Sequence, residues 1–92
     1  MSMTVRVVVS GRVQGVWYRA WTEQQARALG LDGWVRNRRD GTVEAVLAGE
    51  AEVVENMIQA LWEGPPLAQV TAIDRFEHGA PVEPGFGVKP TA

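Results

Sequence analysis

The order of strand-like and helix-like patterns constrains the fold of this chain more than any single residue does. The first pattern is a β-branched run at Thr4–Ser10, in which alternate valines share one face of a predicted strand. Apolar residues at helical spacing then occur twice, and β-prone runs separate and follow them. The predicted strands are Thr4–Ser10, Gly33–Arg39, Thr42–Ala48 and Ala68–Phe76, and the predicted helices are Tyr18–Leu29 and Gly49–Glu63.

Turn signals support these boundaries. Gly30 stands where a left-handed helix C-cap is favoured, Asp40-Gly41 is a hairpin signal, and Gly64-Pro65-Pro66 ends the second helix. The resulting β-α-β-β-α-β order predicts an α+β, ferredoxin-like α/β sandwich, with both helices on one face of an antiparallel sheet. Phe86–Val88 is predicted to add a short edge strand, giving four to five strands. We expect residues 1–92 to form a single domain.

Composition excludes several classes of protein. The chain contains no cysteine, which excludes disulfides and a thiol nucleophile, and its only histidine, His78, falls in a predicted loop. No cluster of Asp, Glu or His that could hold a metal is evident near the glycine-rich segment Gly11–Arg19, and no metal and no cofactor are predicted. No segment reaches the about 20 apolar residues of a membrane span, and the start lacks the pattern of a signal peptide. We therefore expect a cytoplasmic protein without a membrane partner.

Charge is divided unevenly along the chain, although the net charge is only −2. Residues 1–39 contain seven arginines and two acids, whereas residues 40–92 contain nine acids and two basic residues. An arginine-rich half can attract a small anion without the overall basicity that is typical of nucleic-acid binders. Nucleic acid is therefore not a predicted partner, and we expect the chain to be a monomer.

The segment Gly11–Arg19 has the features of a phosphate-binding loop between a strand and a helix. Its two glycines allow the backbone to curl so that successive N–H groups converge, and the following helix offers further unpaired N–H groups. Arg19 adds a planar, permanently charged guanidinium that can form paired hydrogen bonds to phosphate oxygens. The predicted phosphate-binding residues are Val13, Gln14, Gly15, Val16, Trp17, Tyr18 and Arg19.

Asn37, at the end of the second predicted strand, is the second candidate catalytic residue beside Arg19. In the ferredoxin-like plan the first two strands run parallel with the third between them, so their C-terminal ends lie at one edge of the sheet. The loop and Asn37 are therefore expected to meet there. A neutral amide can orient a water for attack on phosphorus without competing for the anion. This arrangement suits phosphoryl transfer, in which positioning and charge stabilisation do most of the work.

The same residues carry a family resemblance. The segment Gly11-Arg12-Val13-Gln14-Gly15-Val16-Trp17-Tyr18-Arg19 and the segment from Gly33 to Val43 resemble the two signatures of the acylphosphatases. This resemblance spans nearly the whole chain and implies a ferredoxin-like enzyme that hydrolyses small acyl phosphates to a carboxylate and inorganic phosphate. It implies that Arg19 binds the phosphoryl group and that Asn37 orients the attacking water. Tyr18 stands where many members have phenylalanine.

Other residues of these segments have simpler interpretations. Asp40 and Gly41 are interpreted as turn residues, and Thr22 as either a residue near the site or a buried, backbone-bonded one. The contributions of four arginines are left open, since a solvated charge is the simpler interpretation for each: Arg12, Arg36, Arg38 and Arg39.

Two alternatives to an acylphosphatase remain. One is a non-catalytic ferredoxin-like module that binds a phosphorylated ligand or single-stranded nucleic acid, although the chain lacks the aromatic pattern of an RNA-recognition sheet. The other is a relative of the N-terminal acylphosphatase-like module of hydrogenase-maturation carbamoyltransferases, which the start methionine and the absence of downstream sequence disfavour. The identity of the acyl group is not readable, because both motifs address the phosphoryl half of the substrate.

Overall fold

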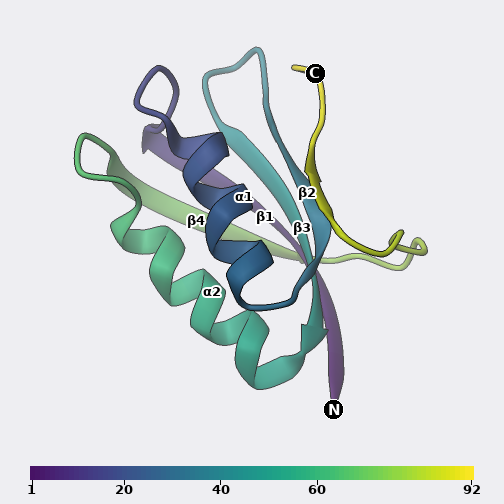
Figure 1. Cartoon of the computed structure of the whole chain (residues 1–92). Coiled ribbons are helices and arrows are strands. Elements are labelled where there is room, and N and C mark those ends of the chain that lie inside the picture. Colours follow the sequence, from purple (N-terminus) through teal and green to yellow (C-terminus); the bar gives the residue numbers. More distant parts are fainter.

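The computed structural model describes all 92 residues and contains seven elements in the expected order (Figure 1). The strands are β1 (Ser2–Arg12), β2 (Asp32–Asn37), β3 (Val43–Glu50), β4 (Gln69–Glu77) and β5 (Phe86–Val88), and the helices are α1 (Tyr18–Ala28) and α2 (Ala51–Glu63). Both helices cover one face of the sheet, which confirms the ferredoxin-like α/β sandwich.

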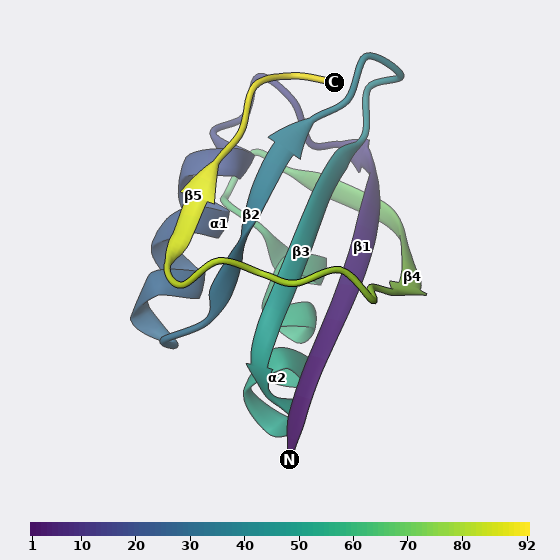
Figure 2. The same ribbon diagram turned by 90° about the vertical axis from the view of Figure 1, so that its right-hand side faces the viewer.

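The sheet has the strand order β4-β1-β3-β2-β5. Since β3 pairs antiparallel with both β1 and β2, the latter two strands run parallel and end at the same edge, as predicted. The loop after β1, the turn between β2 and β3 and the C-terminus all lie at this end of the molecule (Figure 1). The expectation of a purely antiparallel sheet needs correction, because β5 pairs parallel with β2. The connection from β4 crosses the helix-free face of the sheet and enters β5 from the far side (Figure 2).

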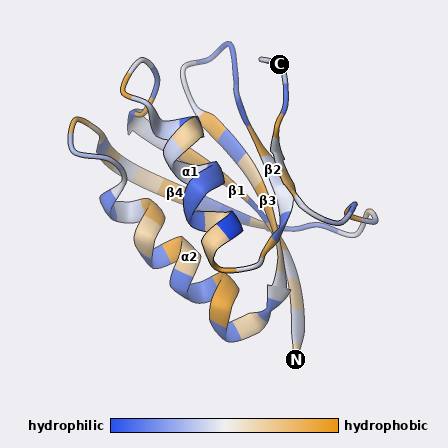
Figure 3. Cartoon of the chain, in the orientation of Figure 1, coloured by the Kyte–Doolittle hydropathy of each residue, from blue (hydrophilic) through white to orange (hydrophobic).

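The core lies between the sheet and the helices. Alternation in β1 buries Val5, Val7 and Val9 on the helix-covered face. On α1, residues four apart face the sheet, and α2 shows alternating apolar and polar patches along its length (Figure 3). The buried residues of the two helices are Tyr18, Thr22, Ala26, Val54, Met57, Ile58 and Leu61.

Helix α1 ends one residue before the predicted end. Leu29, the last residue of the predicted helix, is the C-cap residue and is exposed. The chain turns at Gly30, which has the positive φ of 70° expected of it, and Leu31 donates its N–H to the carbonyl of Ala26. Leu31 is buried in the core cluster in consequence.

Gly11 is also placed differently from the prediction, since it belongs to β1 and not to the anion-binding loop. The pairing of β1 with β4 shifts register between Ser10 and Gly11, which marks a β-bulge. Gly11 has a φ of 120°, and a Cβ there would collide with the backbone carbonyl of Gln69. This glycine therefore allows β4 to approach β1 closely, and the loop itself begins at residue 13.

A buried carboxylate joins three strands on the helix-free face of the sheet. Glu44 of β3 accepts hydrogen bonds from Arg6 of β1 at 3.0 Å and from Arg36 of β2 at 2.6 Å. The two guanidinium groups in turn lie over the rings of Phe76 and Trp34. Burial raises the pKa of Glu44, but the hydrogen bonds and charges of Arg36 and Arg6 outweigh it, so the pKa is lowered below its usual value.

We expect Glu44→Gln to lower the free energy of unfolding by about 1 to 2 kcal/mol near neutral pH, because charge-assisted hydrogen bonds are lost. A lowered folded-state pKa means that the carboxylate stabilises the fold above its usual pKa of 4.5, and that this contribution is lost as the pH falls through the folded value. Urea unfolding between about pH 7 and pH 3 should therefore show a shallower loss of stability in the variant than in the wild type. The matched control is Glu63→Gln, at an exposed position outside any ion pair. An unaltered pH dependence in the Glu44 variant would contradict this role.

A membrane-spanning helix is absent from the structure, in which the longer helix, α2, has 13 residues.

Candidate active site

The loop at residues 13–17, between β1 and α1, presents a series of unpaired backbone donors. No N–H group from Gln14 to Ala20 donates a hydrogen bond to a backbone carbonyl. Gly15 and Trp17 have positive φ angles of 73° and 70°, and alternation of left-handed with other conformations lets successive N–H groups converge on an anion. Helix α1 has no acid in its first turn and no side-chain cap, so the positive end of its dipole is open to the same ligand.

Arg19 supplies a full positive charge beside these donors. It is the second residue of α1 and is half-buried. Its guanidinium forms no ion pair with any carboxylate of the chain. An arginine held at the start of a helix and left without a carboxylate partner retains its donors for an anionic ligand.

Asn37 is the last residue of β2 and is held by β3 on one side and by the C-terminal residue on the other. It pairs with Val43 of β3, and its carbonyl accepts a hydrogen bond from the N–H of Ala92 at 3.0 Å. Ala92 in turn accepts from the N–H of Arg39, so the C-terminal residues extend the pairing beyond β5. The side-chain Oδ1 of Asn37 is buried and has no hydrogen-bond partner in the protein. Such an atom is expected to bond a water or a ligand.

One pocket of about 360 Å³ brings the loop and Asn37 together. Six of the seven predicted phosphate-binding residues line it, and Val16 is the exception. The pocket thus contains both predicted catalytic residues. Its full lining is Val13, Gln14, Gly15, Trp17, Tyr18, Arg19, Ala20, Glu23, Asn37 and Val88.

Gln14 fastens the loop to the neighbouring hairpin. Its Nε2 donates to the carbonyl oxygens of Arg38 and Thr42, both at 2.8 Å. The two carbonyls lie just beyond Asn37, on either side of the β2–β3 turn. Gln14 therefore fixes the position of the loop relative to Asn37 through two hydrogen bonds that are partly shielded from water.

Tyr18 and Thr22 have structural roles in α1. The Tyr18 hydroxyl donates to the carbonyl of Leu61 at 2.6 Å, which ties the first turn of α1 to α2, and burial raises its pKa. Thr22 is buried and its Oγ1 donates to the carbonyl of Tyr18 at 2.8 Å. The backbone-bonded interpretation of Thr22 is therefore the correct one, and Thr22 does not line the pocket.

The remaining arginines of the two motifs lie outside the pocket. Arg36 is bonded to Glu44, and Arg38 lies 4.0 Å from Asp40, while Arg12 is exposed. Asp40 accepts hydrogen bonds from the N–H and the hydroxyl of Thr42, which confirms its interpretation as a turn residue.

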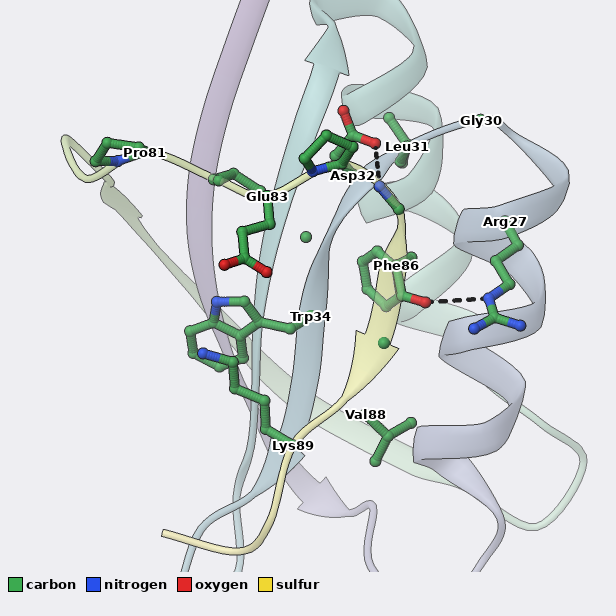
Figure 4. A pocket seen from close by; sticks show the side chains of 15 residues that line it. Arg27, Gly30, Leu31, Asp32, Trp34, Pro81, Glu83, Phe86, Val88 and Lys89 are labelled. Atoms are coloured by element: carbon green, nitrogen blue, oxygen red, sulfur yellow. Dashed lines mark hydrogen bonds between the residues drawn. The ribbon is translucent and has the colours of Figure 1, made fainter.

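A larger groove, of about 820 Å³, lies on the other side of β5 (Figure 4). Two of its charged side chains are already bonded to the backbone there: Arg27 donates to the carbonyl of Phe86 at 3.0 Å, and Asp32 accepts from the N–H of Gly85 at 2.8 Å. These groups hold β5 and the segment before it against α1 and β2. The groove contains neither the loop donors nor Asn37.

Three pocket residues were not predicted from the sequence. Ala20 and Glu23 follow Arg19 on α1, and Val88 ends β5. The sequence could have predicted Glu23 as a pocket residue, because it stands four residues after Arg19 and therefore lies on the same side of the helix. Val88 was not, because its approach to α1 depends on the parallel pairing of β5 with β2.

Fold and pocket together define a ferredoxin-like α/β sandwich with a pocket of unpaired backbone donors and an arginine at one edge of its sheet. A family model described as acylphosphatase matches residues 5–87. An acylphosphatase of Rhizorhabdus wittichii is 56% identical over 86 residues, which cover 94% of this chain and 87% of the relative. The chain belongs to the acylphosphatase family and hydrolyses acyl phosphates.

Solved structures agree with this assignment. An acylphosphatase from Coxiella burnetii has a TM-score of 0.90 and 38% sequence identity, with coverage of 96% of this chain and 93% of that chain. The T. kodakarensis protein HypF is also similar, with a TM-score of 0.85 and 29% identity. The match covers 100% of this chain but only 12% of HypF. This chain therefore corresponds to a small part of HypF.

Proposed function

We propose that this chain hydrolyses the carboxyl-phosphate bond of small acyl phosphates without a metal, using Arg19 and the loop to bind phosphate and Asn37 to orient water. The observation that carries the proposal is the shared pocket of the unpaired loop donors, an unpaired arginine and an asparagine with a buried, unpartnered Oδ1. The first two features suit a phosphoryl group, and the third suits the water that attacks it.

The phosphoryl group lies against the loop, where backbone N–H groups and the Arg19 guanidinium donate to its oxygens. Charge-assisted hydrogen bonds of this kind contribute about 1.5 to 3 kcal/mol each. The donors are rigid, because Gln14 fixes the loop to the hairpin and Tyr18 fixes the start of α1 to α2. Preorganised donors stabilise the charge of the transition state without reorganisation during the reaction.

The attacking water donates a hydrogen bond to Oδ1 of Asn37, which directs its lone pair at phosphorus. A bond forms between the water oxygen and phosphorus, while the bond from phosphorus to the acyl oxygen breaks. The carboxylate leaves with the electron pair of that bond, and a phosphoryl oxygen takes the proton of the water. A carboxylate is a good leaving group, so the reaction needs no protein acid at the leaving oxygen.

The donor set of the pocket favours an anion over a metal ion. Its one carboxylate, Glu23, is paired with Arg27 at 3.1 Å. The other polar groups of its side chains are an arginine, two amides, an indole N–H and the Tyr18 hydroxyl, which is bonded to Leu61. Divalent cations prefer several oxygen ligands, with carboxylates among them. The monomeric state, the single domain over residues 1–92 and the cytoplasmic location remain predictions.

The test is hydrolysis of benzoyl phosphate by the purified protein in excess EDTA, with release of benzoate and phosphate both measured. We expect turnover that added Mg²⁺ does not increase. The matched control is the same protein dialysed against buffer without chelator. Loss of activity in EDTA that returns with Mg²⁺ contradicts the metal-free mechanism. Phosphate binding by calorimetry without any turnover favours the alternative of a non-catalytic binding module.

A further inference from the structure

The pocket has a buried inner part and an exposed, apolar rim. Val13 and Tyr18 are each 1% exposed, whereas Trp17 is 57% exposed and Val88 is 44% exposed. The donors assigned to the phosphoryl group lie on the loop and at the start of α1. A substrate bound there therefore extends its remaining atoms toward the rim.

Trp17 has features that the stability of the fold does not explain. It is the only residue other than glycine with a positive φ, a conformation that L side chains rarely adopt. Its indole stacks on no other aromatic ring and lies under no cation of the chain. A large apolar side chain thus stands exposed at the mouth of the anion pocket, on backbone that the loop holds in place.

The rim also contains one carboxylate, which is paired with Arg27 at 3.1 Å. Glu23 follows Arg19 by one turn of α1, about 6 Å along the helix axis. Val88 pairs with Val35, two residues before Asn37 in β2. Ala20 and Val88 are the other apolar members of this part of the pocket. The atoms beyond the phosphoryl group therefore meet apolar surface and a carboxylate, and no free cation.

We propose that Trp17 and Val88 form a subsite for the acyl half of the substrate, which favours flat apolar acyl groups and disfavours those with a negative charge of their own. The assignment rests on the proposed function and deepens it. An aromatic acyl group stacks on the exposed indole and loses apolar surface to water. An acyl group with a second carboxylate would lose water against this apolar surface without meeting a free cation, and the paired Glu23 carboxylate beside it offers no hydrogen-bond donor.

The test compares kcat/KM for benzoyl, acetyl and succinyl phosphate in wild type and in Trp17→Gly. Glycine adopts a φ of 70° without strain, so this substitution removes the indole and preserves the loop. We expect the ratio of benzoyl to acetyl kcat/KM to fall about tenfold, the size of effect that apolar contacts in a binding pocket produce. Trp17→Phe should restore most of the ratio. Trp17→Asn, which also tolerates positive φ, gives a second variant without the ring.

The matched control is Trp62→Ala, which removes a tryptophan of similar exposure that does not line the pocket and should leave the ratio unaltered. Glu23→Gln should raise the ratio of succinyl to benzoyl kcat/KM several-fold. An unaltered benzoyl to acetyl ratio in both Trp17→Gly and Trp17→Asn overturns the subsite, even though both acyl phosphates are still hydrolysed. Failure of the wild type to hydrolyse any acyl phosphate overturns the proposed function itself, and the two failures are therefore distinguishable.

Discussion

Arg19→Ala is expected to reduce kcat for benzoyl phosphate by at least about 100-fold, because it removes the only guanidinium in the pocket. Two lost charge-assisted hydrogen bonds, at about 1.5 to 3 kcal/mol each, are enough to account for that reduction. The loss should also weaken competitive inhibition by inorganic phosphate, since the same donors bind the product. Steady-state kinetics with phosphate as inhibitor measure both effects.

Arg19→Lys and Arg12→Ala are the matched variants. Lysine keeps the charge but not the planar pair of donors, so Arg19→Lys should recover only a small part of the activity. Arg12 is exposed and outside the pocket, and its replacement by alanine should leave kcat within about twofold of the wild type, as is usual for an isolated surface change. Near-normal kcat and phosphate inhibition in Arg19→Ala would remove the arginine from the mechanism.

Much of this site was predictable because topology alone brings its two halves together. Parallel first and second strands with the third between them follow from the β-α-β-β-α-β order, and they place the loop and Asn37 at one edge. The residue types then indicate the chemistry, because few other residues offer the backbone freedom of glycine, the planar charged donors of arginine or the neutral amide of asparagine. The structure adds the shared pocket, which local patterns predict only indirectly.

The parts that sequence reasoning missed depend on contacts between distant segments. The sequence pattern suggests that Gly11 is a loop glycine. In the structure a glycine is needed at this position because the backbone of β4, nearly sixty residues later in the chain, leaves no room for a Cβ. The two hydrogen bonds of Gln14 likewise depend on how closely the hairpin approaches the loop. Val88 reaches the pocket only because the connection from β4 crosses the sheet before β5 pairs with β2. Periodicity and turn residues carry no information on such approaches.

The left-handed conformation of Trp17 shows the same limit at a single residue. Propensity assigns positive φ to glycine or asparagine, and a tryptophan between a loop and a helix would be expected in an ordinary cap conformation. The observed φ of 70° instead places Trp17 in the left-handed region, within the run of unpaired N–H groups from Gln14 to Ala20. Strain of this kind, about 1 to 3 kcal/mol per residue, is common at functional sites.

Asn37→Ala is expected to reduce kcat by about 100-fold or more while phosphate inhibition stays close to that of the wild type. The amide is proposed to hold the attacking water and not the phosphoryl group. Its removal therefore leaves the water without a group that orients it, while the Arg19 donors to phosphate stay intact. A loss of kcat at nearly constant KM is the pattern of an interaction that acts in the transition state. The fold should tolerate the change, because the hydrogen bonds that hold residue 37 to β3 and to Ala92 belong to the backbone.

Asn37→Asp separates the position of the side chain from its charge. The carboxylate has the same shape and can still accept a hydrogen bond from water, but it is repelled by the bound phosphoryl group. We therefore expect both a lower kcat and weaker phosphate inhibition in Asn37→Asp, whereas Asn37→Ala lowers kcat alone. If Asn37→Ala weakened phosphate inhibition as strongly as Arg19→Ala does, Asn37 would be a phosphate ligand and the attacking water would need another partner.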